Sequence, residues 1–118
     1  MKKNENEILV YYDRENSQAK KVLAYARSMS LHVHEVEYHK TKFTPTMWRQ
    51  LLVRLDMKPK HLLNKAHPYY QLNVAGRDFS EEDWLNVLIR NPDLIKAPIV
   101  VKGTKVILAN NPQDVLGM

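Results

Sequence analysis

The chain contains no cysteine among its 118 residues. This absence excludes disulfides, thiolate catalysis, cysteine-ligated metals and thiol redox sensing. No segment approaches the roughly 18 apolar residues of a membrane-spanning helix, and no apolar stretch follows the basic residues at the start. Low-complexity segments and repeats are also missing. The composition is that of an ordinary globular protein, so we expect one cytoplasmic domain over residues 1–118 that does not enter a membrane.

The rest of the chain is organised around residues 7–26, an apolar run followed by a polar break and a helix pattern. Ile8–Tyr12 is apolar without alternation, which is typical of a strand covered on both faces. From Ala19 to Ala26 the apolar residues recur at helical spacing. Asn16 or Ser17 stands where the helix N-cap is expected. A strand that leads directly into a helix N-terminus can bind an anion through its free N–H groups.

The later pattern alternates strands and helices. A second, less apolar strand is predicted over residues 31–38, parallel to the first and near a sheet edge. Thr44 and Ser80 are predicted helix N-caps, and Pro68 is predicted to end a short helix that Pro59 begins. Two short apolar runs flank Lys102-Gly103 and predict an antiparallel hairpin. The expected fold is therefore α/β, with a mixed four-stranded sheet and a helical insert at about residues 40–92.

The positive charge is concentrated in that insert. Residues 40–65 contain seven Lys and Arg residues against one acidic residue, a net charge of +6, whereas the whole chain carries +5. The leucines and Trp48 of this segment have helical spacing and are predicted to face inward, so the cations should form one surface. Such a surface attracts phosphates or an acidic protein. The first candidates for partner binding are Arg49, Arg54, Lys58 and Lys60.

Several strings resemble the arsenate reductase (ArsC) branch of the thioredoxin fold, which includes the Spx transcription regulators. The string NPDLIKAPIVV over residues 91–101 is close to the family's N-P-x-L-I-x-R-P-I-V-V. Lys60–Lys65 with Pro68-Tyr69, and Asn111-Pro112, also fall where the family has related strings. The resemblance covers about Ile8 to Leu116 and implies a thioredoxin-like domain. It further implies a cis peptide bond between Ala97 and Pro98 beside the active-site loop.

The chain departs from the family at the residues that carry its chemistry. By the resemblance, the catalytic cysteine position is Asn16 and the second redox cysteine is Ala19. Three arginine positions are occupied by Asn64, Ala97 and Asn111. In the reductases these arginines bind the oxyanion and lower the thiol pKa, which Asn and Ala cannot do. Nucleophile and anion clamp are thus missing together, and any ligand site left at Asn16, Ser17 and Pro98 would be vestigial.

These residues favour a redox-inactive, Spx-like binding or regulatory module, a pseudoenzyme without cofactor. By resemblance to Spx, its partner would be an acidic protein such as RNA polymerase. One alternative is a thiol-dependent oxidoreductase that borrows a thiol such as glutathione, which would make the chain a glutaredoxin-like enzyme. Another is nucleic-acid binding through the basic segment, although no RNP, KH or helix-turn-helix signature is present.

Four histidines and Ser17 are candidates for metal binding or catalysis. His32 and His34 lie two apart on a predicted strand, as two metal ligands can, with His39 as a third candidate. Surface or edge-strand histidines are the favoured explanation of the pattern, so we predict no metal site. His67 beside Pro68 is interpreted as a turn residue rather than an acid or base. Ser17 lacks a base at a readable spacing and is interpreted as a polar surface residue.

Overall fold

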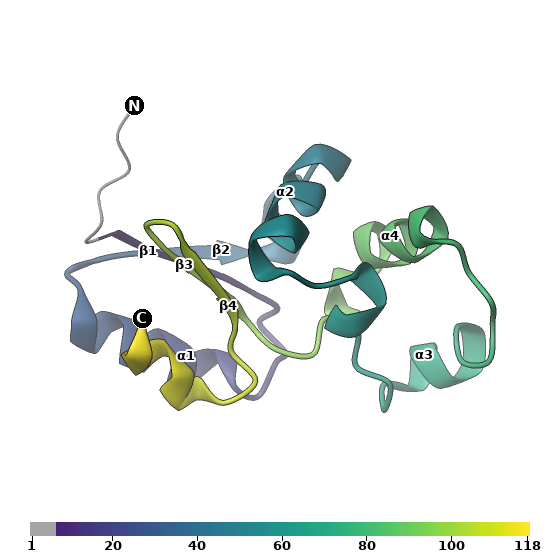
Figure 1. Cartoon of the computed structure of the whole chain (residues 1–118). Coiled ribbons are helices and arrows are strands. Elements are labelled where there is room, and N and C mark those ends of the chain that lie inside the picture. The colour runs from purple at the N-terminus through teal and green to yellow at the C-terminus, as the bar shows by residue number, and fades with distance from the viewer. Residues whose placement is uncertain (1–6) are drawn as a thin grey trace.

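A mixed sheet of four strands forms the centre of the computed structural model, which describes residues 7–118 (Figure 1). The strands are β1 (Glu7–Tyr12), β2 (His32–Glu37), β3 (Ile99–Lys102) and β4 (Lys105–Leu108), in the order β2-β1-β3-β4. β1 is parallel to β2 and antiparallel to β3, and β3 and β4 form an antiparallel hairpin. The predicted thioredoxin-like sheet, with the apolar first strand inside and the more polar second strand at an edge, is confirmed.

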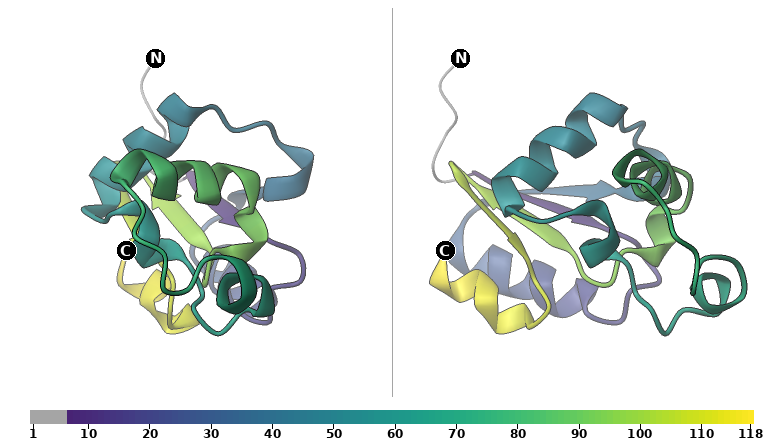
Figure 2. Two further views of the ribbon diagram at one scale, coloured as in Figure 1. Left: turned by 90° about the vertical axis from the view of Figure 1, so that its right-hand side faces the viewer. Right: turned by 45° about the vertical axis from the view of Figure 1, so that its right-hand side comes forward.

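The lack of alternation in β1 follows from its burial on both faces. Ile8 and Val10 pack with α1 (Ala19–Met29) and with the last turn, η4 (Pro112–Gly117). Leu9 and Tyr11 face the opposite side and pack against the helical insert. Figure 2 shows α1 and η4 side by side beneath the sheet, with α2 above it. One strand therefore joins two hydrophobic cores.

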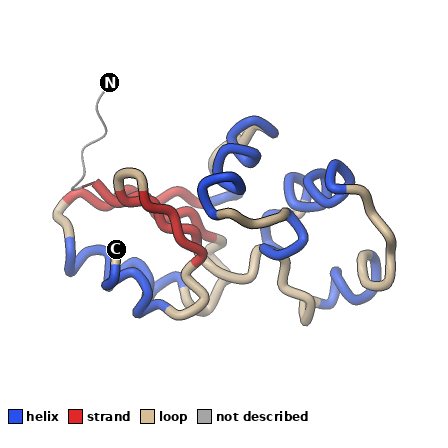
Figure 3. The backbone as a smooth tube through the Cα atoms, viewed as in Figure 1, coloured by secondary structure: helices blue, strands red, loops and turns tan. Residues whose placement is uncertain are grey.

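The regular elements of the insert between β2 and β3 are helices. It contains η1 (Tyr38–Lys40), α2 (Pro45–Leu55), η2 (Pro59–Leu62), α3 (Pro68–Asn73), α4 (Glu81–Arg90) and η3 (Pro92–Leu94). Thr44 and Ser80 cap α2 and α4 as predicted, since their side-chain oxygens accept hydrogen bonds from Met47 N and Asp83 N, each at 3.2 Å. α2 covers the sheet, and α3 lies farthest from it (Figure 3). Trp48 is 1% exposed and belongs to the core, as predicted.

Three local expectations are wrong. Gln18, and not Asn16 or Ser17, is the residue before α1, and its side chain makes no capping hydrogen bond. Pro68 begins α3 instead of ending a helix, because proline at the first helical position loses only an N–H that has no partner there anyway. Among residues 7–118 no peptide bond is cis, so Ala97-Pro98 is trans. Trans is the favoured state of X-Pro bonds in general.

The hairpin turn depends on one glycine. Gly103 and Thr104 form the two-residue connection between β3 and β4, and Gly103 has φ 59°. Glycine at the first central position is what a type II′ hairpin turn requires.

Among residues 7–118 no helix is both long and apolar enough to cross a bilayer.

Tyr38 provides a test of the packing between sheet and insert. Its side chain is 4% exposed beside Trp48 and Phe43, and among residues 7–118 its hydroxyl has no hydrogen-bond partner. A buried hydroxyl without a partner costs about 1 kcal/mol or more. We expect Tyr38→Phe to raise the free energy of unfolding by about 1 kcal/mol in urea denaturation at neutral pH.

The same substitution should change alkaline stability. Burial, with smaller effects from Tyr11 and Asp13, raises the pKa of Tyr38 well above its ordinary 10.0. The folded state therefore holds this proton more tightly, a stabilisation that is complete below pH 10 and lost as pH rises through the folded-state pKa. Tyr38→Phe should reduce this loss of stability at alkaline pH. Tyr69→Phe, at an exposed tyrosine, should leave the loss unchanged. Equal alkaline unfolding profiles for wild type and Tyr38→Phe would contradict this assignment.

Candidate functional site

Asn16 closes the loop between β1 and α1. Its Oδ1 accepts a hydrogen bond from Gln18 N at 2.8 Å, and its Nδ2 donates to the carbonyl oxygen of Lys96 at 3.3 Å. Its backbone carbonyl accepts from Ala19 N at 3.1 Å. Asn16 lies two residues before the N-cap residue Gln18, and its side chain ties the loop both to the helix start and to the segment before Ala97-Pro98. Two backbone donors that an anion would need are already occupied.

Buried acids stand beside the same loop. Asp13 follows β1 and Glu37 ends β2, and both are buried. Asp13 Oδ1 lies 3.6 Å from His39 Nε2, and Glu37 Oε1 lies 3.5 Å from Arg14 Nε. Arg14, which could have assisted anion binding at the helix start, is therefore directed to Glu37. Lys40 Nζ lies 3.4 Å from the second oxygen of Glu37, so Arg14 and Lys40 are both engaged by this carboxylate instead of facing an oxyanion at the helix start.

The chain segments that carry Asn16, Asn64 and Ala97 lie together. Asn64 N donates to Leu94 O at 2.6 Å, and Lys96 N donates to Leu62 O at 2.8 Å, which aligns residues 62–64 with residues 94–96. Asn16 joins this pair of segments through Lys96 O. Ala97 and Pro98 are buried directly after it. The side chain of Asn64 is used locally, with Oδ1 accepting from Ala66 N at 3.0 Å.

Asn111 and Ser17 take no part in a shared site. Asn111 Oδ1 accepts from Gln113 N at 3.1 Å and caps η4. Ser17 is exposed, and within residues 7–118 its hydroxyl makes no hydrogen bond. Asn16, Asn64, Ala97 and Asn111 are all neutral. The three asparagine side chains hydrogen-bond to the backbone. Nothing at these positions supplies a nucleophile or a charge.

The histidines are surface or capping groups. His32 and His34 are exposed on β2, and His34 Nε2 lies 3.8 Å from Glu7 Oε1. His67 Nδ1 accepts from Tyr69 N at 3.1 Å and caps α3, so its interpretation as a structural turn residue is supported. Over residues 7–118 no three His, Asp or Glu side chains form a cluster able to hold a metal ion.

The basic segment is less uniform than its sequence suggests. Arg49 pairs with Glu82 of α4 at 2.7 Å, and Lys58 lies 3.5 Å from Glu81. Arg54 donates to the carbonyl oxygen of Gly103 at 2.8 Å. Lys60 is exposed, and within residues 7–118 it forms no ion pair. Two of the four predicted partner-binding cations are thus partly neutralised by α4.

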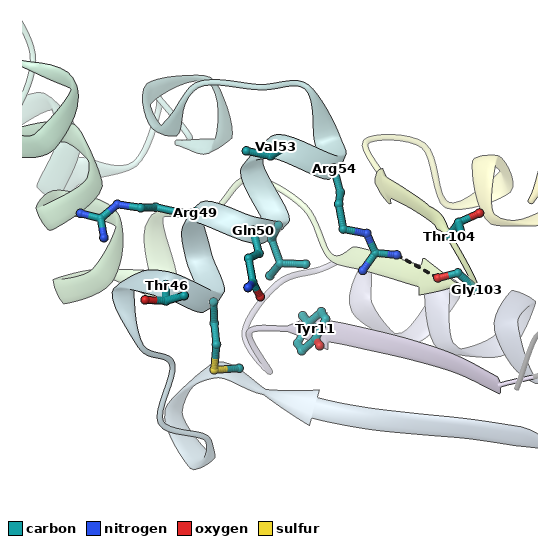
Figure 4. Close-up of a pocket in the computed structure, with 10 residues that line it drawn as sticks. Tyr11, Thr46, Arg49, Gln50, Val53, Arg54, Gly103 and Thr104 are labelled. Atoms are coloured by element: carbon teal, nitrogen blue, oxygen red, sulfur yellow. Dashed lines mark hydrogen bonds between the residues drawn. The ribbon is translucent and has the colours of Figure 1, made fainter. Parts of the chain in front are cut away.

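An open groove of about 770 Å³, which the sequence patterns did not predict, lies between α2 and the hairpin turn (Figure 4). Its lining includes Tyr11 of β1, Met47, Val53 and Arg54 of α2, and Thr104 of the turn. A second groove, of about 660 Å³, lies on the other side of α2 against the start of α4. No local pattern could reveal the first groove, because β1, α2 and the turn are far apart in the sequence.

The sheet order, its two-sided cover and the β1–α1 loop define an α/β protein of the thioredoxin-like class. A model of the ArsC family matches residues 11–118. The chain therefore belongs to the ArsC family, and its lack of cysteine makes it a member without the catalytic thiol.

Relatives match over nearly the whole chain. The uncharacterized protein YfgD of Escherichia coli (strain K12) is 28% identical over 112 residues, which are 93% of this chain and 94% of that protein. A Yersinia pestis protein assigned as an arsenate reductase has a TM-score of 0.84 at 24% identity, covering 95% of this chain and all of that one. An arsenate reductase from Vibrio cholerae has a TM-score of 0.83 at 20% identity, covering 97% and 98%. At these identities the two structures establish the shared fold.

The bridging role of Asn16 is testable by substitution. Asn16→Ala removes the hydrogen bond to Gln18 N and the one to Lys96 O, and we expect the free energy of unfolding to fall by about 1–2 kcal/mol in urea denaturation. Ser17→Ala is the matched control at the neighbouring exposed position and should change it by less than about 0.5 kcal/mol. Equal effects of the two substitutions would refute the structural role of Asn16.

Proposed function

We propose that this protein is a redox-inactive member of the ArsC family that acts as a binding or regulatory module. The observation that carries the proposal is the Asn16 amide, which occupies the nucleophile position and closes the loop by hydrogen bonds to Gln18 N and Lys96 O. An amide is neither a nucleophile nor a redox group at neutral pH. Asn16 therefore holds the loop in its conformation but cannot carry out the chemistry of a thiol.

Loss of the anion clamp supports the same conclusion. Arsenate reduction in the family relies on arginines that hold the oxyanion by charge-assisted, bidentate hydrogen bonds. Here Asn64 and Asn111 cap local turns, and Ala97 has no polar side chain. Arg14 and Lys40, two cations near the loop, pair with Glu37. A borrowed thiol such as glutathione would find neither a bound oxyanion nor a cation to stabilise its thiolate.

The proposal is tested by a direct activity assay. Purified protein with arsenate, glutathione and glutaredoxin should form arsenite no faster than the mixture without it. Asn16→Cys should supply a thiol whose pKa is lowered by the helix N-terminus, detectable by its reactivity with an alkylating reagent, but still no turnover because the arginines are missing. Turnover by the wild-type protein would overturn the proposal in favour of the thiol-dependent oxidoreductase.

We propose further that the partner is an acidic protein recognised by the basic segment, with RNA polymerase as the first candidate through the Spx resemblance. The net charge of +6 over residues 40–65 supports this proposal. Such charge accelerates association with an acidic surface and makes the rate sensitive to salt.

Simultaneous charge reversal of Arg49, Arg54, Lys58 and Lys60 to Glu should abolish binding to immobilised RNA polymerase, measured by biolayer interferometry. Reversal of Arg90 and Lys105, which lie outside the segment, is the control and should leave most of the affinity. A partner indifferent to the four reversals would remove the basis of this proposal. Binding to DNA of any sequence that weakens steeply with salt would favour the nucleic-acid alternative instead.

A further inference from the structure

We infer that the groove between α2 and the β3–β4 turn binds an extended acidic peptide segment of a partner protein, with Arg54 receiving a carboxylate and the wall of α2 receiving an apolar side chain. The inference rests on the proposed function, because it assigns a site and a partner chemistry to that binding module. The groove differs from the predicted partner-binding set, because it uses only Arg54 of the four predicted cations and adds groups from β1 and the hairpin turn.

The groove presents apolar side chains to solvent. Met47 and Val53, both on α2, are 36% and 79% exposed and line it together with the half-buried ring of Tyr11. Leu51 continues this wall toward the core. Figure 4 shows Gln50 directed from α2 toward Tyr11, across the floor of the groove. Exposed apolar groups around a few polar ones are typical of a recognition surface.

The charge of the lining is of one sign. Arg49 and Arg54 are its charged residues, and no acid is among the ten residues that line it. The second groove, against the start of α4, contains both signs of charge, and its Arg49 and Lys58 pair with Glu82 and Glu81. In Figure 4 Arg49 points away from the groove, and it pairs with Glu82. Arg54 is therefore the cation that faces a ligand in this groove.

Arg54 is held in place and still has free donors. One of its terminal N–H groups donates to Gly103 O at 2.8 Å (Figure 4). A guanidinium has five N–H donors, so others remain for the paired oxygens of a carboxylate. The positive φ of Gly103 aims that carbonyl by shaping the turn. Fixing the side chain before binding lowers the entropy cost of the contact.

Tyr11 adds a neutral polar group to the floor. Burial raises its pKa above the ordinary value, and the nearby positive charge of Arg54 partly offsets that shift. The hydroxyl therefore stays protonated at neutral pH and can donate a hydrogen bond. The groove thus combines an oriented cation and a hydroxyl donor with an apolar wall.

The dimensions favour a short extended segment. The lining spans Thr46 to Arg54 on α2, about 12 Å at about 1.5 Å per helical residue. An extended peptide rises about 3.3 Å per residue, so about four residues fill this length. Alternating side chains would place apolar groups against α2 and acidic groups toward Arg54. A nucleic acid needs several cations along a backbone, which this groove does not offer.

The test is an NMR titration of the isotope-labelled full chain with the blocked synthetic peptide acetyl-Glu-Leu-Glu-Leu-Glu-amide. We expect the amide signals of Gln50, Val53, Gly103 and Thr104 to shift together. Arg54→Glu should weaken binding by about tenfold or more, the usual effect of losing one charge-assisted hydrogen bond. Arg90→Glu, which makes the same charge change on α4, should change the affinity by less than about threefold.

A second variant separates recognition from folding. Thr104→Glu keeps Arg54 and places an acid on the exposed rim next to Gly103, where it would repel the peptide and compete for Arg54, so it should weaken binding by a similar factor. The lysine counterpart of the peptide should not bind in the groove. Shifts confined to other surfaces, or groove binding unaffected by both variants, would overturn the inference.

Failure of this site and failure of the proposed function give different results. If RNA polymerase binds through Lys58 and Lys60 while Arg54→Glu and Thr104→Glu leave that binding intact, the groove is wrong and the binding module stands. If the wild-type protein reduces arsenate, the module is wrong whatever the titration shows. Stronger binding of an oligonucleotide than of the acidic peptide to the same groove would also overturn the assigned partner chemistry.

Discussion

Burial of β1 on both faces is the constraint on which the rest of the molecule depends. Ile8 and Val10 fix α1 and η4 beneath the sheet, while Leu9 and Tyr11 receive the helical insert above it. The chain leaves the sheet after Tyr12 and begins α1 at Ala19. Because β1 and α1 are both fixed in the core, the loop between them is held at both ends.

The hydrogen bonds of Asn16 hold this loop together. A thiol and an oxyanion would use the free N–H groups at the start of α1, and here an asparagine side chain and carbonyl use two of them instead. The remaining bond, to Lys96 O, preserves the contact between the loop and the segment before Pro98. The loop is thus closed by local hydrogen bonds, and the open grooves lie elsewhere on the protein.

Patterns that depend on near neighbours predicted this structure well. Thr44 and Ser80 cap their helices, and the apolar run of Ile8–Tyr12 lies inside the sheet, because caps and periodicity report contacts within one or two turns. The failures lie where two choices are nearly equal in energy. Pro68 can follow one helix or begin another, and Asn16 can cap a helix directly or through a turn. Only the packing of the flanking segments selects between them.

By itself, the sequence determined that this ArsC-family chain has no thiol and that the positive charge is concentrated in residues 40–65. Only the tertiary structure decided which of those charges are free to act. Arg49 and Lys58 meet acids of α4, whereas Arg54 meets the hairpin turn and faces an apolar groove. The physical reason is that residue identity sets charge and reactivity, but pairing and exposure depend on segments that only folding brings together.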